Sequence, residues 1–397
     1  TQGAKLAIDL LASSSGSNPT RLIQTLVQHK QGPGALAVAL KGRMLPGDAA
    51  KLVVRAIDSS GRKLDALKLV VSAAGSITTG AKKLSPEEMA AFVADVRNKG
   101  DRVRGEAIYR RANLSCMKCH AIGGAGGKVG PDMGSIGGSA QIDYLIESLL
   151  DPNAKVKEGY HTVIAVTDDG KTFSGIKVRQ TDTQLILRNA EGVESAIALD
   201  SIDEQVNGTS LMPAGLSDKL THQELVDVVR FLSELGKVGG LQVSRDRIVR
   251  NWQVLLPSDD VTYKLRRTRL ASVTEDDPAF VWQPAYSRVI GELPLSDLPK
   301  VMYKGPFQNA PSGLNFLRFS LDVGTAGEVE LALNSVDGVT IWLDGVQLET
   351  ADRTTLNLKA GQHRVTMMVS QVLRTEPVQV QVNDVVGSKA QVQLIVE

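Results

Sequence analysis

Both cysteines of this chain lie in one five-residue segment, Cys116-Met117-Lys118-Cys119-His120. Two thiols separated by two residues can add to the two vinyl groups of a haem, and the histidine that follows is then drawn onto the iron. Because the chain has no other cysteine, a disulfide framework and a second thiolate metal centre are excluded. The segment predicts one covalent haem c, with His120 as an iron ligand.

A thiol redox pair and half of a zinc site are the alternatives to haem attachment at Cys116 and Cys119. A thioredoxin-like pair follows a strand and opens a helix, whereas a predicted helix precedes this pair and the glycine-rich segment 123–130 follows it. A zinc site needs a second pair of ligands, and the sequence offers none. Both arguments favour the haem interpretation.

A haem iron that is closed on both faces needs a second axial ligand, and in electron-carrying cytochromes this is usually a methionine thioether. Met117 lies inside the attachment segment and cannot reach the opposite haem face. Met133 follows His120 by only thirteen residues and is expected on the proximal side. His222 falls in the first turn of a predicted helix, where a solvated side chain is expected. His161, at the start of a predicted strand, stays open as a candidate.

Met212 is the favoured second ligand. It lies in the segment 210–216, after a predicted strand and before a helix, and Pro213 and Gly215 favour an extended loop there. The alternative, a methionine that fills a gap in a core, is the commoner role of methionine in general. Because a loop with Met followed by Pro is an unusual core element, the sequence predicts iron ligation by Met212.

Glycines crowd the segment 123–130, which raises the alternative of a phosphate-binding loop. The pattern fails, because Val129 rather than Ser or Thr follows the lysine, and Ile122 stands where the first glycine is required. Glycine also lets the backbone approach a flat ligand closely, since it has no Cβ. Close contact with the haem edge is therefore expected.

Gly130 and Pro131 are assigned to the same cofactor site. Gly130 ends the glycine-rich segment, and Pro131 and Asp132 follow it directly. A histidine that binds a metal commonly donates its other ring N–H to a carbonyl or carboxylate, which fixes the orientation of the ring. We expect a backbone carbonyl of this tripeptide to accept the Nδ1 proton of His120.

The elements that must position these residues follow from the pattern of apolar residues. Amphipathic helices are predicted over 5–12, 19–30, 49–58 and 64–72, with Pro19 in the first turn of the second. Their spacing resembles the end of a HEAT-type helical solenoid, and a generic helical bundle is the open alternative. Residues 1–80 are predicted to form this helical, HEAT-like segment.

Further helices flank the predicted haem site. A Ser-Pro-x-Glu sequence opens one over 85–99, and a Thr-x-x-Glu sequence opens another over 221–235; both are capping boxes. A helix over 101–113 leads the chain to Cys116. Residues 81–240 are predicted to form a monohaem cytochrome c domain around these helices.

Two regions show the alternating pattern of β-strands. Within 159–207, four strands are predicted as a small antiparallel sheet or barrel, with hairpin turns at Asp169-Gly170 and Glu191-Gly192. Beyond residue 240 the pattern is almost wholly β, so a β-sandwich is predicted over 241–397. The strands are expected at 161–166, 173–178, 184–188, 195–199, 329–333, 339–343 and 364–369.

Length and composition limit the function classes. With 397 residues, 42% apolar and 22% charged, the chain is expected to form roughly two to four globular units. A net charge of +1 gives no global field that would attract nucleic acid, so none is expected as a partner. No run approaches the ~20 apolar residues that span a bilayer. Because the first residue is Thr1, a mature or clipped chain is expected.

Taken together, the motifs resemble the haem-binding c-type cytochrome domain of the planctomycete and verrucomicrobial kind. The resemblance covers about residues 100–237. In that family an insertion interrupts a class I cytochrome c fold, which would explain why Met212 lies 92 residues after His120. The residues that carry this resemblance are Cys116–His120, Gly130-Pro131-Asp132, 149–153, Gly159-Tyr160, the predicted strands within 159–207, and 211–216.

This resemblance implies His120 and Met212 as axial ligands and haem attachment outside the cytoplasm, in the periplasm or at the cell surface. The function it implies is single-electron transfer with a redox partner protein, so the chain is not expected to be an enzyme. Three alternatives stay open: a redox subunit of a sugar-type dehydrogenase, a haem catalyst with an open distal site, and a structural cytochrome that assembles into a homo-oligomer.

The C-terminal region resembles PA14-like or carbohydrate-binding sandwiches more weakly, through residues 335–345 and 358–363. A glycan is therefore a candidate partner. Trp252, Trp282 and Trp342 are candidates for stacking on sugar, with a buried aromatic as the favoured role of each. The basic run 264–269 is expected to be a solvated strand face.

Overall fold

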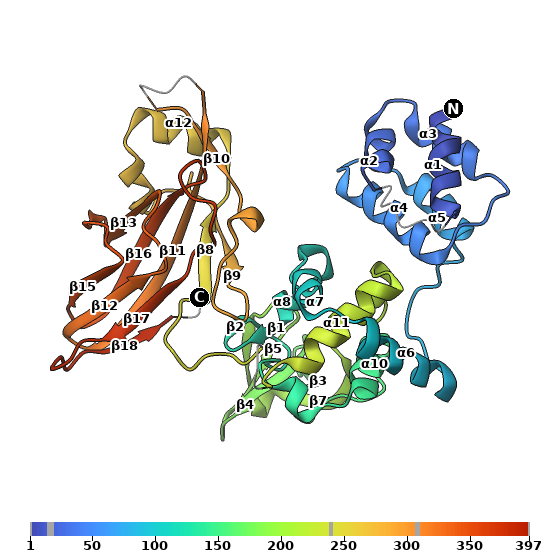
Figure 1. Cartoon of the computed structure of the whole chain (residues 1–397). Helices are drawn as coiled ribbons and strands as arrows, with labels where there is room; N and C mark the ends of the chain where they lie inside the picture. Colours follow the sequence, from blue (N-terminus) through green and yellow to red (C-terminus); the bar gives the residue numbers. More distant parts are fainter. Residues whose placement is uncertain (1, 14–19, 238–240, 306–309, 396–397) are drawn as a thin grey trace. The chain divides into compact units, whose positions relative to one another are not determined.

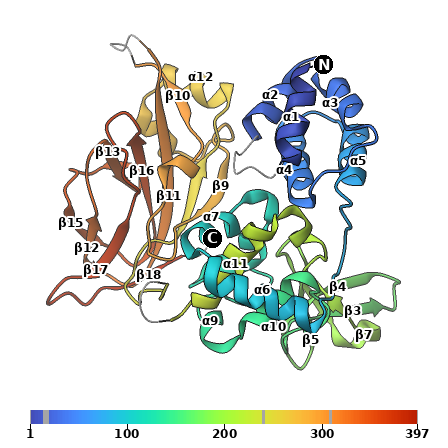
Figure 2. The same cartoon turned by 45° about the vertical axis from the view of Figure 1, so that its right-hand side comes forward.

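The computed structural model describes residues 2–13, 20–237, 241–305 and 310–395, and within them the chain is a mixed α+β protein with several antiparallel sheets (Figures 1 and 2). Two compact units divide it. The first holds 1–119, 128–131 and 136–235; the second holds 120–127, 132–135 and 236–397. Pro19 and the predicted boundary at 240 lie outside the described residues. The division into three domains stays a prediction.

No helix within the described ranges is both long enough and apolar enough to cross a lipid bilayer.

In the described part of residues 2–74, five helices surround a shared apolar core, which includes Ile8, Ile23, Leu36 and Val53 (blue in Figure 1). Four were predicted, and their positions are confirmed to within a few residues. The third was not among the predicted ranges; it begins with Gly-Pro-Gly, and proline is tolerated in a first turn. They are α1 (Gln2–Ala12), α2 (Thr20–Gln28), α3 (Gly32–Leu40), α4 (Gly47–Ser59) and α5 (Asp65–Ala74).

The helices that flank the candidate site form the second part of this unit. Both predicted capping boxes are present, at Ser85 and Thr221. The helix predicted over 101–113 ends at Tyr109, and a 3-10 turn follows. The elements are α6 (Pro86–Lys99), α7 (Arg102–Tyr109), η1 (Ala112–Leu114), α8 (Cys116–Cys119), α9 (Ile136–Ser139), α10 (Ile142–Leu150), η3 (Leu216–Lys219) and α11 (His222–Glu234).

Helices α7 and α11 cross at very close range. A Cβ added to Gly105 of α7 would lie 2.0 Å from the carbonyl oxygen of Asp227 and 2.7 Å from Cβ of Phe231. The rings of Tyr109 and Phe231 meet beside this crossing, with centroids 5.6 Å apart. Only glycine allows this approach. The crossing therefore holds α7, which leads to the cysteines, against α11.

Within the described residues, a five-stranded antiparallel sheet follows α10, in the order β6-β5-β4-β3-β7. The four predicted strands are confirmed, and the turns at Gly170 and Gly192 both have positive φ. The fifth strand, β7, was missed because it is mostly polar and exposed. The strands are β3 (His161–Thr167), β4 (Thr172–Gln180), β5 (Gln184–Arg188), β6 (Glu194–Ala198) and β7 (Ile202–Ser210).

The second unit contains two facing antiparallel sheets in its described part: one of eight strands, with core order β14-β13-β16-β11-β8-β9, and one of three, β15-β12-β17. The strands are β8 (Asn251–Leu255), β9 (Trp282–Tyr286), β10 (Val301–Tyr303), β11 (Ser312–Thr325), β12 (Gly327–Leu333), β13 (Val339–Leu343), β14 (Val346–Gln347), β15 (Arg353–Leu358), β16 (Gly361–Ser370), β17 (Val380–Asp384) and β18 (Gln391–Leu394).

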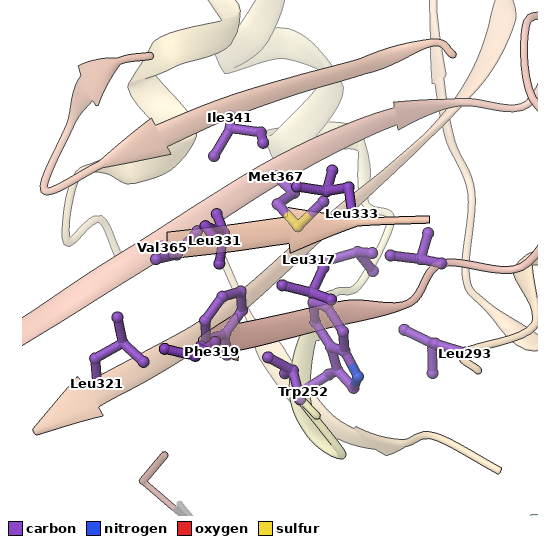
Figure 3. Packing of buried hydrophobic residues seen from close by; sticks show 14 of the residues in the cluster. Trp252, Leu293, Leu317, Phe319, Leu321, Leu331, Leu333, Ile341, Val365 and Met367 are labelled. Carbon is purple, nitrogen blue, oxygen red and sulfur yellow. The ribbon is translucent and has the colours of Figure 1, made fainter. Parts of the chain in front are cut away.

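Side chains from both sheets pack into one core. Figure 3 shows Leu331 of β12, from the smaller sheet, beside Phe319 of β11 and Met367 of β16, from the larger one. Trp252 packs edge-on against Phe319, with ring centroids 5.3 Å apart. The arrangement is that of two β layers, as alternating strand patterns produce.

One prediction for this unit is wrong. The basic run 264–269 was expected on a strand face, but its residues up to Arg267 belong to α12 (Asp259–Arg267). The Ser258 hydroxyl caps this helix by accepting the N–H of Val261 at 3.1 Å. Val261 and Leu265 are buried, and this four-residue spacing is the helical one.

Candidate cofactor site

The two cysteines lie on a single helical turn, α8, and both are free thiols. Residues three apart on a helix lie on the same side, so Cys116 and Cys119 are presented together. Ser115, directly before them, has φ of 58°, a left-handed conformation that residues other than glycine seldom adopt and that clusters at functional sites. The N–H of Lys118 closes the turn onto the Ser115 carbonyl at 3.0 Å.

The electrostatics of the thiols do not suit a redox pair. Burial, with a smaller contribution from the neighbouring thiol, raises the pKa of Cys116 to about 11. Burial also raises the pKa of Cys119. A reactive cysteine pair needs a lowered pKa, because the thiolate is the nucleophile. Among the described residues, no cluster of three or more His, Cys, Asp or Glu side chains could hold a metal ion, so zinc gains no support either.

A short hairpin of β1 (His120–Ile122) and β2 (Ala125–Lys128) follows the cysteines. The Asp132 carboxylate holds its turn by accepting the N–H groups of Gly123 at 3.0 Å and Gly124 at 2.7 Å. Gly126 has φ of 129°, and a Cβ there would lie 2.5 Å from the carbonyl oxygen of His120. Glycine at 126 is thus required by the backbone of His120 itself; approach to a haem edge stays a prediction.

Gly130 closes the loop that begins at the cysteines, because its N–H donates to the Cys119 carbonyl at 2.7 Å. Arg188 of β5 donates to the Lys128 carbonyl at 2.6 Å, which ties the end of the glycine-rich segment to the inserted sheet. Pro131 is half-buried next to this closure. The hydrogen bond expected from His120 Nδ1 to a carbonyl of 130–132 stays a prediction.

Met212 is half-buried in the loop between β7 and η3. Its N–H donates to the Ser210 hydroxyl at 3.1 Å, and the N–H of Ser210 donates to the Asn153 side-chain oxygen at 2.9 Å. Asn153 belongs to the 149–153 motif, so this motif holds the start of the methionine loop. Because β7 ends at Ser210, the strand that sequence reasoning missed is the one that brings the chain to Met212.

The other ligand candidates have different environments. Met117 is buried within the first unit, and Met133 is half-buried, with its N–H on the Ala121 carbonyl at 2.7 Å. His222 is exposed, as expected, and its Nε2 lies 2.8 Å from the Asp95 carboxylate. His161 is exposed at the first position of β3, opposite Ser210 of β7. His161 and the start of the methionine loop therefore lie at the same end of these two paired strands.

Two tryptophans of the second unit cannot stack on a sugar, because they are buried. Trp252 donates its Nε1 proton to Ser287 at 2.9 Å, and Trp342 is 3% exposed. Trp282 is partly exposed, and the guanidinium of Arg318 lies 4.2 Å from its ring centroid. The favoured role as a buried aromatic is confirmed for Trp252 and Trp342.

A shallow hollow of about 690 Å³ in the first unit lies between α6, α9 and α10. Its walls include Met89, Tyr144 and Lys157, and Lys155 lies over the Tyr144 ring at 5.9 Å. None of the predicted haem residues lines this hollow, so it is not part of the candidate cofactor site.

Sequence reasoning missed an ionic cluster beyond the methionine loop. Arg55 binds both oxygens of Glu224, at 2.7 and 2.5 Å, and Arg111 binds one at 2.6 Å. Burial alone would raise the pKa of Glu224, but hydrogen bonds from Arg55, the Thr221 N–H and Arg111 outweigh it and lower the pKa to about 2. The capping box had marked Glu224 only as a helix start.

A scan against models of known protein families and a search of curated proteins found no match for this chain. The functional argument therefore rests on the donor set. Two free thiols on one helical turn and an imidazole directly after them are the groups that attach haem c, and a thioether in a tied loop is one group that can supply a second iron ligand. These residues fit that cofactor.

Proposed function

We propose that this chain is a c-type cytochrome that passes single electrons. The observation that carries the proposal is the presentation of both cysteines of the chain, as free thiols, on one helical turn directly before His120. Cys116 and Cys119 would hold one haem through thioether bonds. His120 and Met212 are its proposed axial ligands, and Gly130 and Pro131 support the imidazole side.

Haem c supplies one-electron oxidation and reduction at its iron. The chain's own residues bind and orient it. The left-handed Ser115 turns the chain into the attachment helix, and Gly126 lets β2 pack against the backbone of His120. If His120 and Met212 both bound the iron, no coordination site would be left for a substrate, which favours outer-sphere transfer over catalysis.

The finer fold assignment belongs to the same proposal. A class I cytochrome c core is supported by the close crossing of α7 and α11, with the five-stranded sheet as its insertion between α10 and α11. A HEAT-like assignment of α1–α5 is supported by the contacts of α1 with α3, α2 with α4 and α3 with α5, since stacked helix pairs in a solenoid contact one another in this way. The resemblance supports a location in the periplasm or at the cell surface, and a dehydrogenase or another cytochrome as redox partner.

The test is an absorption spectrum of the full chain, produced in a host that matures c-type cytochromes. We expect a pyridine adduct that counts one haem per chain, and in the oxidised protein the charge-transfer band of iron–thioether ligation. A protein without haem would contradict the proposal. A haem protein without this band would instead favour the catalyst with an open distal site. Particle size in solution tests the alternative of an assembling structural cytochrome.

A further inference from the structure

The segment that follows Met212 is held by side chains of α4, far away in sequence but within the same compact unit. The Asp48 carboxylate accepts the N–H of His222 at 2.9 and 3.1 Å. Lys51 donates to the Leu220 carbonyl at 2.6 Å. Arg55 donates to the Lys219 carbonyl at 2.8 Å. Three consecutive turns of one helix therefore hold the backbone between η3 and α11.

Arg55 also connects this segment to the stretch before the cysteines. Its two nitrogens bind the Glu224 carboxylate in a bidentate pair, and Arg111, five residues before Cys116, shares that carboxylate. Lys219 donates to the Asn113 carbonyl at 2.9 Å. Bidentate arginine–carboxylate pairs are among the stronger and more directional polar contacts.

A third contact comes from the chain after α5. The side chain of Asp218 is buried, and its carboxylate accepts the N–H of Gly80 at 3.0 Å and pairs with Lys82. A buried carboxylate is costly unless it is paired and hydrogen-bonded. The segment 216–224 therefore depends on groups that the N-terminal helices and their connection supply.

We propose that Asp48, Lys51 and Arg55 are positioning residues for Met212. This inference rests on the proposed cytochrome function. The methionine loop is tied at its start through Ser210 to Asn153, and at its end through the α4 contacts. Pro213 and Ala214, between these ties, are exposed. Release of the second tie frees the backbone of the loop, and this added conformational entropy weakens ligation by the thioether.

The experiment compares Arg55→Gln and Lys51→Gln with the control Arg43→Gln. Arg43, just before α4, pairs with Asp9 of α1, and both side chains of that pair are exposed. Arg55→Lys keeps the charge and loses the bidentate geometry. The readouts are haem content, the thioether band during urea titration, the reduction potential, and hydrogen exchange of the amides in 211–222.

We expect unchanged haem content in all four variants. Arg55→Gln should lose the thioether band at lower urea than the parent, show a lower potential, and exchange the amides of 216–222 about tenfold faster or more, since hydrogen bonds to charged groups are lost. Lys51→Gln should show a smaller effect in the same direction, Arg55→Lys an intermediate one, and Arg43→Gln none.

A parent-like band, potential and exchange in both Arg55→Gln and Lys51→Gln would overturn the inference. If Arg55→Gln fails to fold by far-UV circular dichroism, the milder Lys51→Gln decides. A chain without haem would contradict the proposed function instead; hydrogen exchange in 216–222 would then still test whether α4 holds this segment.

Discussion

The attachment turn and the methionine loop supply the two sides of the proposed iron site, and they are built in opposite ways. Cys116, Cys119 and His120 lie within five consecutive residues, and one helical turn presents the thiols. The chain around Met212 is held by groups that are distant in sequence: Asn153 accepts from Ser210, before Met212, and α4 contacts residues 219–222, after it. In the proposed site, local geometry would determine haem attachment and tertiary contacts would position the second ligand, so the two should respond differently to mutation.

The largest expected effect is loss of the haem. Replacing both cysteines, Cys116→Ala with Cys119→Ala, removes both thioether bonds, so covalent haem should fall to zero. The pyridine adduct measures this directly. Met117→Leu is the matched control, because it keeps the volume of a buried neighbour on the same turn and should keep full haem. Covalent haem in the double variant would show that attachment lies elsewhere.

Met212→Ala should affect the second iron ligand without affecting haem attachment. Haem should remain attached, because the attachment turn is unchanged, but the thioether band should disappear. The reduction potential should fall by roughly a tenth of a volt or more, within the ~0.8 V range that axial ligands span. Met133→Ala is the control. If the Met133 variant, and not the Met212 variant, loses the band, the ligand assignment is wrong.

Gly105→Ala tests the crossing that links both sides, because α7 leads to the attachment turn and α11 follows the methionine loop. The new Cβ would lie 2.0 Å from the Asp227 carbonyl, so the helices must separate. We expect a loss of about 4 kcal/mol in unfolding free energy, measured by urea titration. Gly34→Ala, a helical glycine with open space around it, should change stability by less than about 1 kcal/mol.

The smallest effect concerns pH and the cluster beyond the methionine loop. The pKa of Glu224 is about 2 in the folded chain and 4.5 without the fold, so its ionised form stabilises the fold above pH 4.5. That contribution, on the order of 1 to 2 kcal/mol because solvent screens this partly exposed group, is lost as pH falls from 4.5 towards 2.

Urea titrations at pH 7 and pH 3 should therefore show a smaller pH effect in Glu224→Gln than in the parent chain. Asp58→Asn is the control, since Asp58 pairs with Lys68 at an exposed site and exposed pairs contribute little. An equal pH effect in the parent and in Glu224→Gln would exclude this cluster as a source of stability.

Much of the fold could be predicted where local signals agree. The capping boxes at Ser85 and Thr221 marked the two helices that flank the site, and alternating apolar residues marked four of the five inserted strands. β7 was not predicted because most of its side chains face solvent, so that it lacks an alternating apolar pattern although it pairs with β3. Helix α3 was not predicted because the Gly-Pro-Gly sequence at its start is also typical of a turn.

In the candidate site, too, local sequence patterns reveal some residues and only the fold reveals others. The cysteine pair and His120 could be named as candidates from the sequence because haem attachment requires this spacing of two thiols and a following histidine. The contacts of Asp48, Lys51 and Arg55 with residues 219–224 could not be predicted, since these three residues precede Met212 by more than 150 positions and have the pattern of an ordinary solvated helix face. Only the fold brings them to the chain after the methionine loop.

The most direct test of the central claim is mass spectrometry of the mature chain, intact and after proteolysis. The intact mass should exceed that of the polypeptide by one haem, and the excess should map to the peptide that contains Cys116 and Cys119. An intact mass equal to the bare polypeptide, from a host that attaches haem to a control cytochrome, would contradict it.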